Sequence, residues 1–314
     1  MKYLVNSSVD PHRNMAFDEY ALESIEADEP LFYLWQNAPA VIIGLNQSPY
    51  AEVNLPYLEE HGIALARRVT GGGAVYHDLG NLNYSIVGPL RQMEDAFELV
   101  PAALRTLGAD VERTGRNDIF ISGRKCSGYA KRLSKNRMMI HGTLMWNVDI
   151  EVLTKALQAP GSKISAAGIA SVRSRVANLS EFLPQFDCID AFRGALHDVL
   201  AGGDSEYALT TGADDAIGRL ACEKFATWDW IYGRSPATEH ASTAKFPCGT
   251  VTAHYTLRHG VFTALRFTGD FIGALPADEL AAALIGHSPA DLPSFPVSGY
   301  FDGTSASLLA TLFA

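Results

Sequence analysis

Residues 67–85 read RRVTGGGAVYHDLGNLNYS and are the most informative stretch of the chain. Two arginines lead into three consecutive glycines. Glycine has no Cβ, so the backbone N–H groups around it can approach an anion closely. Arginine adds a fixed charge and a fork of donors that suits phosphate or carboxylate. The stretch therefore predicts a site for an anionic small molecule; a tight hairpin that needs glycine only for positive φ is the alternative.

This glycine turn differs from the common nucleotide-binding fingerprints. Both the P-loop and the dinucleotide motif require a helix after the glycines, whereas a strand-like run follows here. We expect residues 63–68 to enter the turn as a strand and residues 82–87 to return as its antiparallel partner. Mixed strands and helices with hairpin connections predict an α+β fold rather than a doubly wound parallel sheet.

The composition argues against nucleic-acid and membrane partners. The chain has 314 residues, 47% of them hydrophobic, which is enough for one large domain or two. Its 25 basic and 35 acidic residues give a net charge of −10, whereas nucleic-acid binders are usually basic. No apolar run is long enough to span a bilayer, and no signal-peptide pattern opens the sequence. We expect a cytoplasmic protein with reduced thiols and without structural zinc, because its cysteines lie far apart.

Hydrophobic periodicity predicts the order of helices and strands. Helices are expected at residues 14–22, 54–61, 97–107, 151–157 and 192–200, and strands at 31–35, 40–44, 119–121 and 138–146. The segment between the last two strands is polar, basic and glycine-containing, so we expect a loop. Its cations at 131–137 either face an acidic partner or are simply solvated.

The character of the sequence changes after Pro236. Residues 249–257 alternate, 258–260 form a turn signal and 261–267 return, which indicates a hairpin. Helices are expected at 279–285 and 305–313. We predict a catalytic domain at residues 1–244 and a small α+β domain at 245–314, after a Ser/Thr/Ala-rich connector at 238–243.

Five motifs, in order, resemble those of the lipoate–protein ligase A family. They are the glycine-rich stretch itself, GRND with GRKCSG at 115–118 and 123–128, HGTL at 141–144, GIASVRSRV at 168–176, and WDW through YGRSP at 228–236. Together they cover most of the chain. The resemblance implies a large mixed or antiparallel-sheet catalytic domain of the biotin/lipoate ligase type, with a C-terminal accessory domain as in bipartite ligases.

The implied activity is ATP-dependent lipoate–protein ligation. A carboxylate is a poor electrophile, so such an enzyme first makes lipoyl-AMP and then passes the lipoyl group to a lysine. The site must bring two anions together and exclude water. The implied acceptors are apo lipoyl domains of 2-oxoacid dehydrogenase E2 subunits and the glycine cleavage H protein.

The resemblance also assigns the main ligand contacts. Lys125 would bridge the lipoate carboxylate and the α-phosphate of ATP in both half-reactions. Arg68 would contact the adenylate phosphate or the incoming carboxylate. The run Gly73, Ala74, Val75 and Tyr76 would offer backbone and ring surface to ATP.

Three further side chains have open roles. Asp118 could help hold Mg²⁺, since one carboxylate plus substrate phosphates is a usual magnesium arrangement, or it could bond only within its Asn-Asp turn. His141 could face the acyl chain of lipoate, support Lys125, or be structural. His77 and Asp78 are expected to cap the turn that follows the glycines.

Two positions depart from the family pattern, and one residue suggests a different reaction. Leu45 and Ala167 stand where many family members carry basic residues, which puts some ligand contacts in doubt. Cys126 is adjacent to Lys125, which could lower the pKa of its thiol. The alternative function is therefore an octanoyl or lipoyl transferase acting through an acyl-cysteine at Cys126; otherwise Cys126 is a small residue filling a turn.

Overall fold

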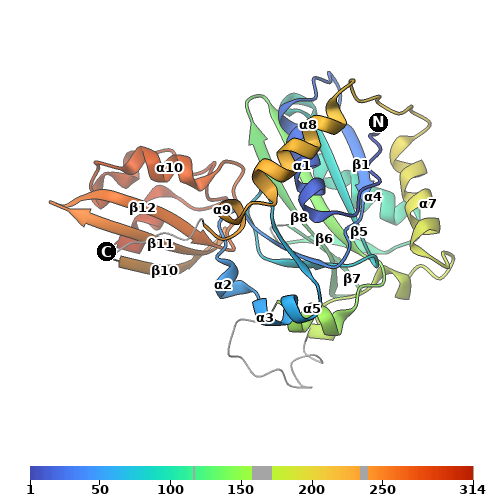
Figure 1. The fold of residues 1–314 in the computed structure, drawn as a ribbon, viewed down its shortest axis with the longest axis horizontal. Helices are drawn as coiled ribbons and strands as arrows, with labels where there is room; N and C mark the ends of the chain where they lie inside the picture. Colours follow the sequence, from blue (N-terminus) through green and yellow to red (C-terminus); the bar gives the residue numbers. More distant parts are fainter. Residues whose placement is uncertain (116, 158–171, 234–239, 314) are drawn as a thin grey trace.

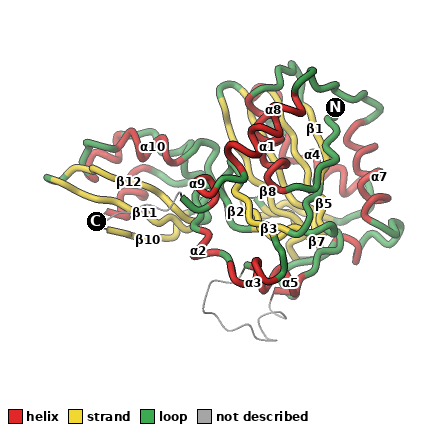
Figure 2. Tube along the Cα trace, viewed as in Figure 1, coloured by secondary structure: helices red, strands yellow, loops and turns green. Residues whose placement is uncertain are grey.

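The computed structural model describes residues 1–115, 117–157, 172–233 and 240–313. The chain forms a large body around a six-stranded sheet and a small C-terminal body around a three-stranded sheet, which lie side by side (Figure 1). Helices flank the strands in both bodies (Figure 2). The α+β prediction is confirmed.

The large sheet is antiparallel throughout and has the strand order β1-β5-β9-β8-β7-β6. Its strands are β1 (Leu31–Trp35), β5 (Asn81–Pro89), β6 (Val111–Thr114), β7 (Asp118–Ile121), β8 (Arg124–Ser134) and β9 (Arg137–Met145). Successive side chains of a strand point to opposite faces. In β1, Phe32 and Leu34 enter one hydrophobic cluster, while Leu31, Tyr33 and Trp35 enter another.

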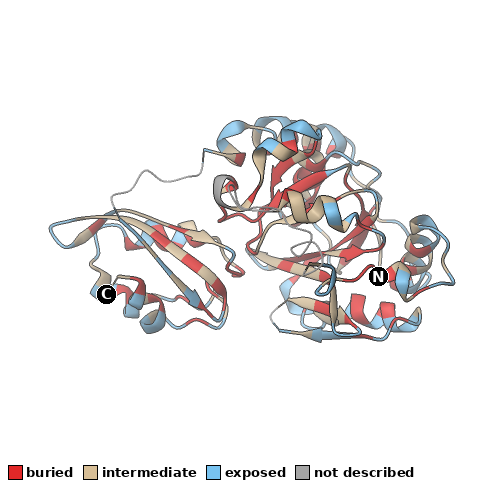
Figure 3. Cartoon of the chain, turned by 90° about the horizontal axis from the view of Figure 1, so that it is seen from below, coloured by how far each residue is buried: buried red, intermediate tan, exposed pale blue. Residues whose placement is uncertain are grey.

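Helices cover both faces of this sheet. Helix α1 (Pro11–Glu23) packs in the cluster that contains Tyr33 and Trp35, whereas α4 (Ala96–Thr106) and α7 (Ile189–Ala201) pack in the opposite cluster. Buried residues accordingly follow the strands through the centre of the large body (Figure 3). The face beneath α1 is the one that carries the site described below.

The large body also contains a three-stranded sheet, and its strand pairing differs from one that we predicted. It contains β2 (Ala40–Ile43), β3 (Ala64–Arg67) and β4 (Val75–His77), with β3 parallel and β4 antiparallel to β2. The prediction that residues 82–87 pair with 63–68 is wrong. Both edges of β5 are occupied by β1 and β9, and β4 returns from the glycine turn to pair with β2 instead.

The predicted basic loop between residues 121 and 138 is also wrong, because most of it is β8. Its backbone pairs with β7 on one side and β9 on the other. Cys126, Ser127 and Ala130 are buried, while the cationic side chains stay partly exposed. The aliphatic stems of such cations can cover apolar surface, and Lys131 lies over the ring of Phe97.

In the described part of the chain, the remaining predicted helices are present, together with three short α-helices that were not predicted. Predicted ones include α3 (Leu55–Glu60), α5 (Ile150–Ala156), α10 (Ala277–Leu284) and α11 (Ala306–Ala310); the additional ones are α2 (Pro49–Glu52), α8 (Ala213–Leu220) and α9 (Trp228–Ile231). Within the described ranges, no helix has the length and apolar character needed to cross a membrane.

The small body contains β10 (His240–Phe246), β11 (Gly249–Arg258) and β12 (Val261–Gly269). The hairpin predicted for β11 and β12 is confirmed, with His259 and Gly260 at positive φ in its turn. Strand β10 pairs along β11. Residues from His240 onward therefore belong to this sheet rather than to a connector, and the predicted division at residue 245 falls inside β10.

The segment after β12 joins the two bodies at the glycine turn. The N–H of Gly72 donates to the carbonyl of Phe271 at 2.9 Å, and the N–H of Leu133 donates to the carbonyl of Ala274 at 2.8 Å. The Lys131 ammonium pairs with Asp302 at 2.9 Å. The small body therefore contacts β8 and the glycine turn directly.

We predict opposite effects of two Gly→Ala changes. An added Cβ at Gly142 of β9 would lie 2.5 Å from the buried ring of Tyr84, whereas at Gly194 in α7 it would meet nothing within 4 Å. Gly142→Ala should lower the free energy of unfolding by about 1–3 kcal/mol through overpacking. Gly194→Ala should raise it by up to about 1 kcal/mol, because glycine is unfavourable inside a helix. Urea unfolding measures both, and equal effects would contradict this packing.

Candidate active site

A cavity of about 120 Å³ lies where α1, the large sheet and the glycine turn meet. The strand register explains which side chains line it. Trp35, Asn83 and Thr143 are direct neighbours across β1, β5 and β9, so they share a face of the sheet. The rest of the lining combines apolar side chains, polar side chains and glycine backbone, mainly Met15, Ile42, Arg68, Gly72, Gly73, Ala74, Val75, His77, Lys125, Gly128 and His141.

Lys125 lies at the mouth of this cavity, with 40% of its side chain exposed. Its ammonium pairs with Asp118 of β7 at 2.7 Å. Gly128 leaves room for the lysine, because an added Cβ there would lie 3.1 Å from Nζ. The backbone N–H of Lys125 donates to the carbonyl of Arg175 at 2.8 Å, which ties β8 to the motif at 168–176. A cation is thus held where a ligand can reach it.

Asp118 is placed to orient Lys125, and it has the chemistry of a magnesium ligand. Mg²⁺ commonly binds one or two carboxylates together with substrate phosphates. Among the described residues, no group of three or more His, Cys, Asp or Glu side chains is arranged to hold a metal ion. A metal at Asp118 would therefore depend on oxygen ligands from a bound substrate.

Arg68 is buried and holds the glycine turn in shape. Its Nη2 donates to the carbonyls of Gly71 at 2.6 Å and Gly73 at 2.8 Å, and its Nη1 to that of Ile42 at 3.1 Å. Burial lowers the pKa of the guanidinium to about 10, so it stays charged at neutral pH. Its positive charge therefore lies in the cavity wall while most of its donors organise the backbone.

The glycines have separate roles. Gly72 has φ +90° and Gly71 makes room for the carbonyl of Phe271, which would lie 2.7 Å from an added Cβ. Gly73, Ala74 and Val75, which the sequence analysis assigned to ATP, line the cavity. Tyr76 does not line it, because successive side chains of β4 point to opposite faces and the neighbours of Tyr76 face the cavity.

Tyr76 instead packs in a hydrophobic cluster with Val41, Ile43 and Met145. The structure thus brings Arg68, Gly73, Ala74, Val75, Lys125 and His141 around one cavity and places the ring of Tyr76 outside its lining.

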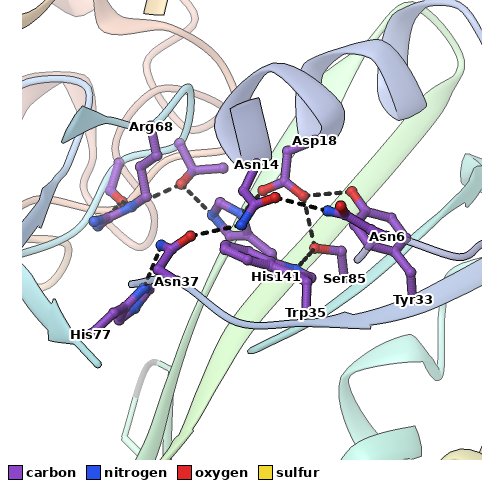
Figure 4. A network of polar contacts seen from close by, with 12 residues as sticks. Asn6, Asn14, Asp18, Tyr33, Trp35, Asn37, Arg68, His77, Ser85 and His141 are labelled. Atoms are coloured by element: carbon purple, nitrogen blue, oxygen red, sulfur yellow. Dashed lines mark hydrogen bonds and ion pairs between the residues drawn. The ribbon is translucent and has the colours of Figure 1, made fainter. Parts of the chain in front are cut away.

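His141 belongs to a polar network beneath α1 (Figure 4). Its Nδ1 lies 2.6 Å from Oδ2 of Asp18, and its Nε2 lies 2.7 Å from the hydroxyl of Thr70. Arg68 Nε donates to that same hydroxyl at 3.0 Å. If the Thr70 hydroxyl in turn donates to Nε2, then Nδ1–H donates to the carboxylate and every group is satisfied.

Asp18 is the central residue of this network, and the sequence analysis did not assign it to the site. Its other oxygen, Oδ1, accepts from the hydroxyls of Tyr33 and Ser85, and burial with the nearby carboxylate raises the pKa of Tyr33 well above its usual value. The available signal was a pair of polar side chains, Asn14 and Asp18, four residues apart on the buried face of a predicted helix.

His77 lines the cavity rather than capping a turn, so that part of the prediction is wrong. Its Nδ1 lies 3.0 Å from the amide nitrogen of Asn37. Burial, with nearby Arg68 and His141, lowers its pKa to about 3, so the ring is neutral. Asp78 does cap the turn, accepting from the N–H of Gly80 at 2.8 Å.

Cys126 is unsuited to nucleophilic catalysis. Its side chain is fully buried in the cluster of α4 and α7, and its thiol donates to the carbonyl of Ile119. Burial raises the pKa of this thiol to about 12. Since the thiolate is the reactive form, the acyl-cysteine alternative is disfavoured.

The structure describes one of the two positions that depart from the family pattern, Leu45, and the basic segment at 131–137. Leu45 is buried, and its N–H donates to the carbonyl of Thr70 at 2.8 Å. Ala167 lies outside the described residues. In the basic segment, Arg132 donates to the carbonyl of Val69 and Arg137 to that of Leu22. Together with the Lys131–Asp302 pair, these contacts within the chain engage much of the charge predicted for an acidic partner.

Two sequence families match the chain. Residues 10–201 match the lipoyl protein ligase A/B catalytic domain, and residues 235–291 match the bacterial lipoate protein ligase C-terminus. The chain is similar to lipoate-protein ligase LplJ of Bacillus subtilis, at 38% identity over 301 residues that cover 91% of this chain and 90% of the relative. It is equally similar to lipoate–protein ligase 1 of Staphylococcus aureus, at 38% identity over 294 residues with the same coverage. The chain belongs to the lipoate–protein ligase family.

Solved structures agree. P. falciparum LipL1 in complex with lipoate has a TM-score of 0.76 and 26% identity, covering 90% of this chain and 88% of that one. The bipartite ligase of Thermoplasma acidophilum, described with its E2 lipoyl domain, has a TM-score of 0.67 and 30% identity, covering 76% and 98%. A lipoate-protein ligase A bound with ATP has a TM-score of 0.62 and 29% identity, covering 73% and 97%.

The lowered pKa of His77 predicts a pH dependence of stability. Between about pH 6.5 and 3, the unfolded chain binds a proton at this residue and the folded chain does not. Above pH 6.5 neither state binds this proton, so the free energy of unfolding is not reduced. As the pH falls below 6.5, proton uptake by the unfolded chain lowers the free energy of unfolding, and wild-type stability should therefore drop faster than that of His77→Phe. Between pH 6.5 and 4.5 the extra loss should be about 2 kcal/mol. Urea unfolding across this range measures it, and parallel pH profiles would contradict a neutral buried ring.

Proposed function

We propose that the chain activates lipoate with ATP to give lipoyl-AMP and then transfers the lipoyl group to a lysine of a protein acceptor. The observation that carries this proposal is the position of Lys125, a cation at the mouth of a cavity whose inner wall includes Met15, Trp35 and Ile42. A fatty-acid-like chain fits the apolar wall, and its carboxylate fits the cation. Family membership supports ligation, and solved relatives are described with lipoate and with ATP.

In the first half-reaction, a carboxylate oxygen of lipoate attacks the α-phosphorus of ATP, and pyrophosphate leaves. Two anions must approach each other, so the Lys125 ammonium lowers the barrier by stabilising the charge that develops between them. Asp118 holds that ammonium at the cavity mouth. The buried charge of Arg68 adds a positive potential from the glycine-turn side.

In the second half-reaction, the acceptor amine attacks the acyl carbonyl of lipoyl-AMP. The C–O bond to AMP breaks, AMP leaves with the electron pair, and the amine loses a proton as the amide forms. Lys125 again stabilises the oxygen that carries negative charge. The walls of the cavity keep water from the mixed anhydride.

The glycine turn is the part of the site that we assign to the nucleotide. Gly73, Ala74 and Val75 line the same cavity as Lys125, and the missing side chain at Gly73 allows phosphate to approach the backbone. Mg²⁺, when bound with the phosphates, would supply charge neutralisation, and Asp118 is the side chain that we propose to reach it.

The proposed acceptors are apo lipoyl domains of 2-oxoacid dehydrogenase E2 subunits and the glycine cleavage H protein. One structural relative is described together with its E2 lipoyl domain. Because Lys125 is partly exposed, an acceptor lysine can reach the acyl carbonyl from outside the cavity.

We predict that Lys125→Ala lowers the rate of acceptor lipoylation by about 10²–10³-fold, the scale for removing a donor that stabilises developing charge. Intact mass of an apo lipoyl domain after incubation with lipoate and Mg-ATP measures the product, with an ATP-omitted control.

Cys126→Ser is the matched control, because a serine hydroxyl can still donate to the carbonyl of Ile119. It should retain activity. If Lys125→Ala were fully active, the role proposed for Lys125 would be overturned. If only octanoyl-carrier protein gave a product and Cys126→Ser abolished it, the ligase proposal would be overturned in favour of a thiol transferase.

A further inference from the structure

Two buried N–H donors face the cavity without a protein acceptor. His77 and Asn83 both line it and are 3% and 1% exposed. Within the described part of the chain, neither His77 Nε2 nor Asn83 Nδ2 has a hydrogen-bond partner. An unpaired donor in such a place costs free energy, so two of them in one cavity wall indicate that a ligand supplies the acceptor.

A line of amides fixes the proton of His77 on Nε2. Asn14 Nδ2 lies 2.8 Å from the carbonyl oxygen of Gln36, which can only accept, so this atom is a donor. It also donates to Oδ1 of Asn37 at 2.7 Å. The other end of Asn37 is therefore its NH₂ group, which donates to Nδ1 of His77. With Nδ1 as acceptor and the ring neutral, Nε2 carries the hydrogen.

The amide of Asn83 bonds to a neighbour on the same strand. Its Oδ1 accepts from Asn81 Nδ2 at 2.9 Å, which leaves Nδ2 as the end without a partner. The strand register places Asn83 between Trp35 and Thr143, and both of these neighbours also line the cavity. The donor therefore belongs to the wall against which an acyl chain would lie.

Burial gives the cavity a direction. Lys125 is 40% exposed at the mouth, whereas Trp35, His77 and Asn83 are almost completely buried. An acid whose carboxylate meets Lys125 would extend its chain toward these inner residues. The far end of the chain, rather than its carboxylate, would meet the two donors.

We propose that His77 and Asn83 select an acyl chain that carries acceptor atoms at its far end, the dithiolane sulfurs of lipoate, over an all-hydrocarbon chain such as octanoate. This inference rests on the proposed function. A divalent sulfur is a weak acceptor, but a hydrocarbon offers none and leaves both donors unpaired. Sites built around hydrogen-bond donors reject analogues that lack the matching group more strongly than apolar pockets discriminate size.

The first test uses the unmodified protein. Its kcat/KM for ATP-dependent acylation of an apo lipoyl domain is compared for lipoate, octanoate and 5-cyclopentylpentanoate, which keeps the ring of lipoate but replaces both sulfurs with methylene groups. We expect lipoate to be preferred over each of the other two by about tenfold or more. Equal use of lipoate and the carbocycle would overturn the inference.

The second test removes the donors. His77→Phe and Asn83→Leu keep approximate shape, and each should lower the lipoate-to-carbocycle ratio by about fivefold or more. Met15→Leu is the matched control, because it changes the same cavity wall without removing a donor. It should change the efficiency with both acids by the same factor.

The outcomes separate this inference from the proposed function. An unchanged ratio in both donor variants would overturn the selection by His77 and Asn83 while ATP-dependent ligation stands. If no acid supported ATP-dependent acylation by the unmodified protein, the proposed function itself would fail. Should one variant not fold, the other donor variant still tests the inference, and equal use of lipoate and its carbocycle by the unmodified protein would still overturn it.

Discussion

The buried carboxylate of Asp18 is the constraint around which the site is arranged. A charge removed from water must be compensated by hydrogen bonds or by an opposite charge. Asp18 takes hydrogen bonds from β1 through Tyr33, from β5 through Ser85 and from β9 through His141. Three neighbouring strands are thus tied to α1 by one side chain. Through Thr70 the same network reaches Arg68, which shapes the glycine turn.

This arrangement makes the histidines dependent on α1. Asn14 and Asp18 lie one helical turn apart, and each leads to a different imidazole, His77 through Asn37 and His141 directly. The helix therefore determines which nitrogen of His77 carries its hydrogen and supports the orientation of His141. Neither Asn14 nor Asp18 lies in a motif that sequence reasoning associated with the ligands.

Much of the fold followed from the sequence because local signals agreed with tertiary packing. Most helices, strands β1, β5, β7 and β9 of the large sheet, and the C-terminal hairpin were predicted from periodicity. The failures concern information that is not local. β8 is rich in cations and glycine, but pairing on both edges makes it a strand. The partner of β5 depended on which edges remained available.

In the site, too, residues in local motifs were predicted, whereas residues whose role depends on distant strands were not. The motifs predicted Arg68, Lys125 and His141 as site residues, and all three line one cavity in the structure. Tyr76 stands in the same motif as Val75 and His77, yet strand alternation turns its ring into a different cluster. Asp18 could not be assigned from sequence, because its role depends on three strands that lie between 13 and 127 residues further along the chain.

Arg67 shows that a residue can stand in a ligand-binding motif for architectural reasons. It is adjacent to Arg68 but reaches away from the cavity lining, and its guanidinium donates to carbonyls of Gly44, Leu45, Gln47, Trp230 and Ile231. The last two belong to α9, close to where the chain leaves the large body. A lysine ammonium has three donors radiating from one point and could not replace this planar fork. Of the two arginines that open the motif, one therefore lines the cavity and the other fastens the end of the large body to β3, the strand that leads into the glycine turn.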